Sequence, residues 1–171
     1  MTRPLKQKGA ARVSPGDGSG SSVATGVAVL DHLLAELAET GGFDLHLEIA
    51  PGEPEAEVGA AGVALGQAFA PLLAGSDAAG RGVGVVPADE ALAMVVIEAS
   101  GNPLVASNAD LTATKAGGLQ TDLAAAFLQG LADAAGLTIH VRLFEGEDSQ
   151  HVLSAIFKAL GAALAEACSE P

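Results

Sequence analysis

The sequence has no tryptophan and no tyrosine, five phenylalanines and a single cysteine, Cys168. A single cysteine excludes an intramolecular disulfide and does not form a metal cluster by itself. Hydrophobic residues still make up 49% of the chain, and many of them are alanine. Since large aromatic side chains are scarce, we expect a core of small-residue helices packed on strands of Val, Ile and Leu.

Positive charge is also scarce: 8 Lys and Arg stand against 21 Asp and Glu, and the net charge is −13. Such a field repels nucleic acid and anionic lipid, and it disfavours a phosphate substrate unless local cations counteract it. No apolar run reaches the ~18 residues of a membrane span, and the basic N-terminus lacks the apolar stretch of a secretory signal. We therefore expect a cytoplasmic protein with no nucleic-acid and no membrane partner.

The chain contains an internal repeat. Phe43-Asp-Leu-His46-Leu matches Leu137-Thr-Ile-His140-Val, and Gly52-Glu53 matches Gly146-Glu147, both with an offset of 94 (140 − 46 and 146 − 52). Ala64-Leu-Gly66 then matches Ala159-Leu-Gly161 with an offset of 95 (161 − 66), so one residue was inserted or lost. Self-similarity of this kind predicts a duplicated half-domain, in which Leu30–Phe69 and Ala124–Leu164 have the same topology.

Local patterns predict the elements of each repeat. Residues 1–22 include a Gly/Ser-rich run and are expected to be a flexible tail. Residues 23–171 are expected to form one domain, with repeats at about 26–75 and 117–168. Apolar periodicity and breakers predict the following order: a helix over about 25–42, strand Phe43–Ile49, a helix over about 55–73, strands 84–86, 92–97 and 104–106, a helix over Leu123 to Leu131, strand Leu137–Phe144, and helix Ser149–Cys168 capped by Asp148 or Ser149.

Six blocks of sequence resemble the imidazoleglycerol-phosphate dehydratase family. They are Thr25-Gly26 to Leu34, Gly42-Phe43-Asp44-Leu45, Gly62 to Ala68, Val86-Pro87-Ala88-Asp89-Glu90-Ala91-Leu92-Ala93, Ser100-Gly101, and Phe157-Lys158-Ala159-Leu160. The resemblance implies an α/β (α+β) fold made by tandem duplication, a two-layer sandwich of sheet against helices that is ribosomal protein S5 domain 2-like. It also implies trimers that build a larger shell, and a lyase of histidine biosynthesis that uses two manganese ions at subunit interfaces.

The family's metal motifs are broken in this chain. The family has a His-His-x-x-Glu motif in each repeat, and imidazole and carboxylate ligands of this kind suit manganese. Here the first motif falls on Glu55, Ala56 and Gly59, and the second on Gln150, His151 and Ser154. The arginine that contacts the substrate phosphate in the family is replaced by Asn102, and the family's N-terminal strand is expected to be lost in the Gly/Ser tail.

The residues that remain are few. The resemblance assigns His32, His140 and His151 as vestigial metal ligands and Lys158 as a substrate-binding residue, and it leaves no catalytic residue. We therefore predict a degenerate homologue without a cofactor, which forms a trimer or larger homo-oligomer and assembles or regulates an active dehydratase paralogue. Three alternatives stay open: one Zn²⁺ or Mn²⁺ held by the histidines, an active lyase with an atypical site, and a small-ligand binder.

Two further features have ordinary structural interpretations. Asp89-Glu90 could be a carboxylate pair for acid–base chemistry, but the surrounding strands favour a turn at this point. His46 matches no family histidine and is expected to be an exposed strand residue.

Overall fold

The computed structural model describes residues 9–109, 115–116 and 119–170. The long helices carry the core, and the strands form two main sheets and one short pair. The elements are β1 (Gly9–Pro15), β2 (Ser22–Ala24), α1 (Ala28–Gly41), β3 (Phe43–Ile49), α2 (Pro54–Leu73), β4 (Arg81–Ala88), β5 (Ala91–Glu98), β6 (Leu104–Ser107), β7 (Lys115–Ala116), β8 (Leu119–Gln120), α3 (Thr121–Ala135), β9 (Thr138–Glu145) and α4 (Ser149–Cys168).

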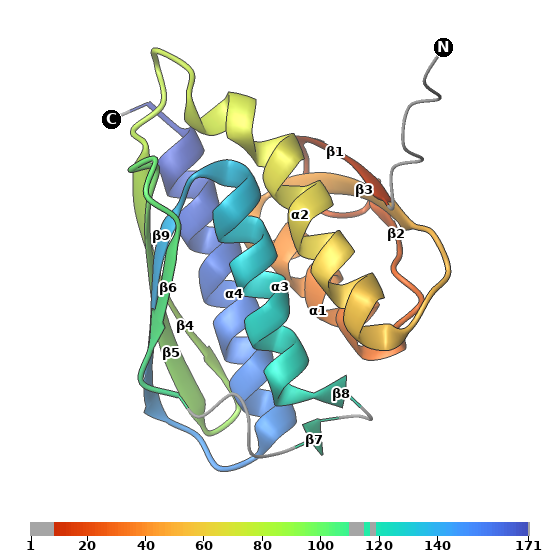
Figure 1. Ribbon diagram of the computed structural model, residues 1–171. Helices are drawn as coiled ribbons and strands as arrows, with labels where there is room; N and C mark the ends of the chain where they lie inside the picture. The colour runs from red at the N-terminus through yellow and green to blue at the C-terminus, as the bar shows by residue number, and fades with distance from the viewer. Residues whose placement is uncertain (1–8, 110–114, 117–118, 171) are drawn as a thin grey trace.

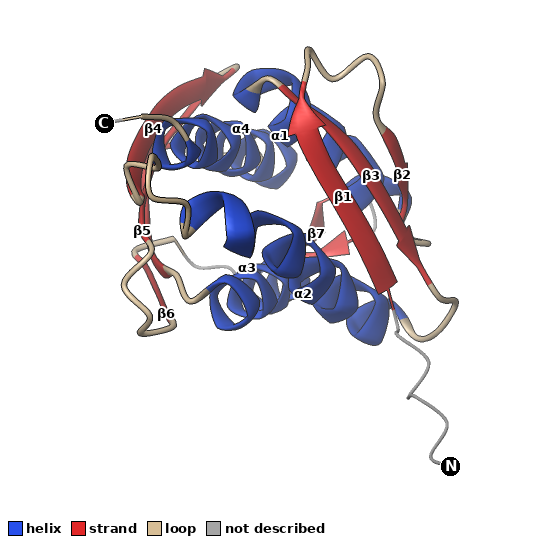
Figure 2. Ribbon diagram, turned by 90° about the horizontal axis from the view of Figure 1, so that it is seen from above, coloured by secondary structure: helices blue, strands red, loops and turns tan. Residues whose placement is uncertain are grey.

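The two main sheets lie on the outside of the molecule, with the four helices between them (Figure 1; Figure 2). The first sheet has the order β1-β3-β2 and is covered by α1 and α2. The second has the order β4-β5-β9-β6 and is covered by α3 and α4. The halves meet where α1 packs on α4 and α2 packs on α3. Each half is therefore the expected two-layer α/β unit, and the predicted fold class is confirmed.

The predicted duplication is confirmed at the level of topology. The order α1–β3–α2 in the first half recurs as α3–β9–α4 in the second. Strand β3 pairs antiparallel with β1 and parallel with β2, and β9 pairs in the same two ways with β5 and β6. His46 lies between Arg12 and Ser22 in the first sheet, and His140 lies between Val96 and Ala106 in the second.

This register extends the repeat beyond the sequence match and corrects the N-terminal prediction. β1 and β2 are the counterparts of β5 and β6, so 9–15 and 22–24 belong to the folded sheet. The predictions of a flexible tail over 1–22 and of a lost N-terminal strand were therefore wrong for these residues. The Gly/Ser run that suggested a tail is the connection between two strands, where Gly18 and Gly20 donate their N–H groups to Asp44 of β3.

Small residues let the two halves approach closely. A Cβ on Gly62 of α2 would collide with the carbonyl oxygen of Phe127 in α3, and one on Gly161 of α4 would collide with the carbonyl oxygen of Leu37 in α1. The rings of the fully buried Phe127 and Phe157 contact each other in a tilted arrangement, with 5.2 Å between their centroids. The core is thus alanine- and glycine-rich at the helix crossings, as the composition predicted.

The helices α2 and α4 are long and apolar enough to span a membrane by length and composition alone. However, 50% of the apolar window in α2 and 56% of that in α4 are buried inside the fold. Burial of this extent is typical of core helices in a soluble domain, so the two helices give only weak evidence for a membrane span.

Candidate functional site

A polar cluster joins α1 to α4 around one carboxylate, Glu36. The side chain of Glu36 is 14% exposed. Its Oε1 lies 3.2 Å from Nε2 of His32 and accepts a hydrogen bond of 2.8 Å from Oγ of Ser154, while its Oε2 lies 3.3 Å from Nζ of Lys158. His32 and Glu36 are four residues apart on α1, and Ser154 and Lys158 are four apart on α4, so each pair shares one helix face.

This cluster contains three of the positions that the family resemblance marked. His32 was predicted as a metal ligand, Lys158 as a phosphate contact, and Ser154 stands where the second motif has its glutamate. The structure brings all three together, but around a carboxylate of the chain itself. Sequence reasoning missed Glu36; its i, i+4 spacing to His32 was the available signal.

A small hollow lies beside His32. His32 and Gln150 line one hollow together with Val29, Leu33 and Leu153, and its volume is about 10 Å³. A hollow of this size holds roughly one water molecule. The cluster itself opens to solvent, since the His32 side chain is 65% exposed.

His151 belongs to a second cluster at the first turn of α4. Its Nδ1 lies 2.7 Å from Oε2 of Glu90, and its Nε2 lies 3.3 Å from Oδ2 of Asp89. Glu90 also accepts a 3.1 Å hydrogen bond from the backbone N–H of Asp148, the residue that caps α4 as predicted. The hydrogen bond that the Glu90 carboxylate accepts from the His151 ring raises the pKa of His151. The hydrogen bonds that Glu90 accepts, first from the backbone N–H of Asp148 and then from His151, lower the pKa of Glu90.

Asp89 and Glu90 form the predicted turn between β4 and β5, with Asp89 at a φ of 51°. The turn also has a second function that the sequence did not show, since it holds the start of α4 through His151.

His140 lies apart from both clusters. It is exposed on the outward side of β9 and makes no side-chain hydrogen bond or ion pair with any described residue. Across the described part of the chain, no three His, Cys, Asp or Glu side chains are arranged to hold a metal ion. One chain therefore does not assemble the predicted set of His32, His140 and His151, and a site shared between subunits stays a prediction.

The first broken motif lies on the exposed side of α2. An open groove of about 450 Å³ runs there, lined by Gly9, Ala56, Gly59, Ala60, Val63, Ala64 and Gln67. Manganese takes about six oxygen or nitrogen ligands, and this lining offers only one polar side chain, an amide. The residues present at this position do not fit the metal that the resemblance implies.

Cys168, the single cysteine of the chain, is half-buried at the end of α4. Burial raises the pKa of its thiol to about 11, so the reactive thiolate is scarce at neutral pH.

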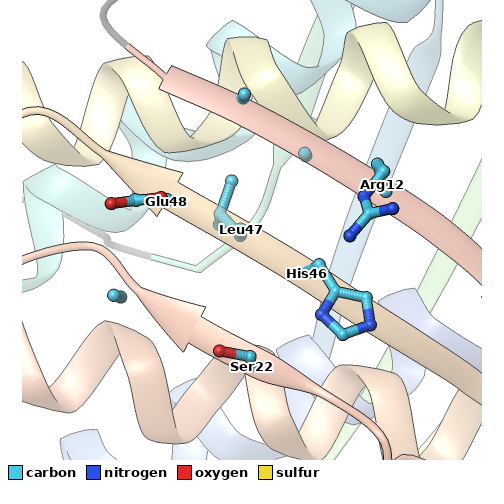
Figure 3. A pocket seen from close by; sticks show the side chains of 8 residues that line it. Arg12, Ser22, His46, Leu47 and Glu48 are labelled. Carbon is cyan, nitrogen blue, oxygen red and sulfur yellow. The ribbon is translucent and has the colours of Figure 1, made fainter.

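A hollow that the sequence did not single out lies on the outer face of the first sheet. Its volume is about 520 Å³, and Arg12, Ser22, His46 and Glu48 are among its lining residues (Figure 3). The only signal in the sequence was the position of His46, which matches His140 in the repeat.

The fold places this chain among two-repeat α/β proteins in which the helices pack between two outer sheets. The family model for imidazoleglycerol-phosphate dehydratase matches residues 25–164. The imidazoleglycerol-phosphate dehydratase of Acetivibrio thermocellus is 39% identical over 157 residues, covering 88% of this chain and 80% of the relative. That of Clostridium botulinum strain Kyoto is 39% identical over 150 residues, covering 85% and 76%.

Solved structures agree with these relatives. The imidazoleglycerol-phosphate dehydratase of Staphylococcus aureus has a TM-score of 0.87 and 30% identity, covering 97% of this chain and 96% of that one. The Pyrococcus furiosus structure has a TM-score of 0.85 and 26% identity, covering 99% and 94%. The chain belongs to the imidazoleglycerol-phosphate dehydratase family. Because of this membership, the activity to test is a lyase reaction, namely the dehydration in histidine biosynthesis.

Proposed function

We propose that this chain is a non-catalytic member of the dehydratase family that acts as an assembly or regulatory subunit. The observation that carries the proposal is the Glu36 cluster: one carboxylate binds His32, Ser154 and Lys158. In the family these positions serve a metal ion and the substrate phosphate. Here their polar groups have a partner within the chain.

Electrostatics supports this interpretation. A phosphate that approached Lys158 would have to compete with a mostly buried carboxylate already 3.3 Å from the ammonium group. Asn102 supplies no positive charge where the family has an arginine, and the chain as a whole carries −13. The net field and the local field therefore both oppose a phosphorylated substrate at this position.

The outer face of the second sheet supports an assembly role. Four large apolar side chains are exposed among the described residues of this sheet, namely Val83 (41%), Val85 (53%), Leu104 (47%) and Phe144 (54%). Cross-strand neighbours place Val83 next to Val96 and Val85 next to Met94, which extends the apolar area across β4 and β5. Apolar patches of this kind mark contacts with other chains. We propose a homo-oligomer of three or more copies, or a mixed assembly with an active dehydratase.

The direct test is turnover of imidazole glycerol phosphate by the purified protein with added Mn²⁺. We expect no dehydration above background, while the Acetivibrio thermocellus relative is active in the same assay. Complementation of a histidine auxotroph that lacks its own dehydratase is the second readout, and we expect no growth without histidine. Turnover or growth would instead establish an active lyase with an atypical site.

A further inference from the structure

We propose that the outer face of the first sheet binds a small molecule that carries an anionic group at one end and a cationic nitrogen at the other. The proposed site is the hollow of about 520 Å³ over β1, β3 and β2, defined by Arg12, Ser22, His46 and Glu48. It is separate from the Glu36 cluster, and it does not depend on whether the chain catalyses the family reaction.

Three hydrogen-bonding side chains lie in one row across the sheet. Arg12 of β1 and Ser22 of β2 are the direct cross-strand partners of His46 in β3. Figure 3 shows the guanidinium group of Arg12 and the imidazole ring of His46 on the same side of the sheet. A guanidinium group, a ring N–H and a hydroxyl can all donate to one anionic group, and the planar guanidinium suits carboxylate and phosphate oxygens.

The hollow has a physical cause. The residues that flank this row and the next are small: Ala10 in β1, and Ser22 and Ala24 in β2. The longer side chains of Arg12, His46 and Glu48 therefore rise above their neighbours and leave space between them (Figure 3). The strand beneath the hollow is held in place by the core, because Leu47, between His46 and Glu48, is 2% exposed and packs into the core.

No side chain in the described part of the chain forms an ion pair with the charged groups of the hollow. In a chain with 21 acidic residues, Arg12 makes no ion pair with any described residue, and neither does Glu48. Asp44, the next outward residue of β3 before His46, accepts N–H groups from Gly18 and Gly20 instead. An available guanidinium in such an acidic protein is a strong local attraction for an anion.

Glu48 determines the charge that the other end of the ligand must carry. It is two residues after His46 on the same strand, so its carboxylate emerges on the same face about 7 Å further along. A simple anion is attracted by Arg12 but repelled by Glu48. A simple cation is attracted by Glu48 but repelled by Arg12. A molecule with both charges separated by a few bonds satisfies both ends, as in a phosphorylated or carboxylated amine.

The second repeat shows that these residues are not required by the fold. In the other sheet His140 has Val96 and Ala106 as its neighbours in place of Arg12 and Ser22. Arg142 occupies the position equivalent to Glu48, at the same offset of 94 (142 − 48). The same backbone therefore supports an apolar row, and the polar row of the first sheet needs a separate explanation.

The experiment is isothermal titration calorimetry of the full chain with O-phosphoethanolamine, ethyl phosphate, inorganic phosphate and ethanolamine. We expect O-phosphoethanolamine to bind at least tenfold more tightly than the other three probes. Arg12→Ala should weaken its binding at least tenfold. Glu48→Gln should weaken the binding of O-phosphoethanolamine severalfold and strengthen the binding of ethyl phosphate, so that the affinities for the two probes become nearly equal.

Arg142→Ala is the matched control, since it removes an outward arginine from the equivalent strand, and it should leave the affinity unchanged. Thermal melting of each variant checks that it is folded. Absence of saturable binding, an affinity unchanged in Arg12→Ala, or an equal loss in Arg142→Ala would overturn the proposal. A dehydratase assay on the same samples separates this result from the question of catalysis.

Discussion

Nζ of Lys158 in α4 lies 3.3 Å from Oε2 of Glu36 in α1, across the contact that joins the two halves of the molecule. The lysine is the one described basic side chain in an ion pair with an acid, apart from histidines. Lys158 was predicted to bind substrate, and it binds a carboxylate of its own chain.

Glu36→Gln should lower the free energy of unfolding by about 1–2 kcal/mol, because it leaves Lys158 without its counter-charge at a position that is only 32% exposed. Urea denaturation measures this. Glu39→Gln is the control, since Glu39 is exposed on the same helix, and it should change stability by less than ~0.5 kcal/mol. Equal stability of Glu36→Gln and Glu39→Gln would remove the argument for a tightly held cluster.

The His151 contacts should make stability depend on pH in a defined direction. The pKa of His151 is raised, so its contribution is fully present below the unfolded value near 6.5 and is lost as pH rises through the folded pKa. The pKa of Glu90 is lowered, so its contribution is present above the unfolded value near 4.5 and is lost as pH falls through the folded pKa. The pair of His151 and Glu90 should therefore stabilise the fold most between pH 4.5 and pH 6.5.

The measurement is the melting temperature of wild type and His151→Gln across pH. The difference between them should be largest between pH 4.5 and 6.5 and should shrink towards alkaline pH. His140→Gln is the control, because His140 is exposed and has no ion pair with a described residue. A difference that is constant over the whole range would contradict the linkage.

Gly62→Ala should destabilise the protein by roughly 1–3 kcal/mol, since the added Cβ would meet the backbone of Phe127 and force α2 away from α3. Gly59→Ala in the same helix meets nothing within 4 Å and should be neutral or stabilising by up to ~1 kcal/mol. Denaturation of the two variants side by side tests the close helix contact, and similar values for both would argue against it.

The purified protein should hold no stoichiometric manganese after dialysis, because the donors of both His-His-x-x-Glu motifs are largely replaced. Elemental analysis is the measurement, with the Acetivibrio thermocellus relative as the reference. About two ions per chain would show that neighbouring subunits or other residues complete a metal site.

Light scattering should show a trimer or a larger oligomer that tightens as salt rises, because salt screens the repulsion between chains of −13 charge. Val85→Glu, on the exposed apolar face of β4, should weaken the assembly. Ala35→Glu adds the same charge at an exposed position of α1 and should not. A monomer at both low and ~0.5 M salt would rule out the assembly role and favour a small-ligand binder.

The sequence determined the duplication, the order of the longer helices and strands from Phe43 onward, and the bounds of α4, for which it offered Asp148 or Ser149 as the cap. These features depend on local rules, such as apolar periodicity, glycine breakers and capping, which act over a few residues. The short strands β7 and β8 were not predicted. The same local rules misjudged 9–15, where Gly/Ser neighbours suggested a tail. Pairing of β1 with β3 is a contact between distant segments, and composition does not report it.

Only the tertiary structure decided what the predicted site residues bind. The packing of α1 on α4 brings Glu36 to Lys158 and Ser154, more than a hundred residues away in the chain, and the β4–β5 turn reaches His151. The same holds for the row of Arg12, His46 and Ser22, which exists because β1 and β2 pair on opposite sides of β3. A sequence motif names the side chains that could act, but the partners that neutralise or leave them available are set by helix packing and strand register.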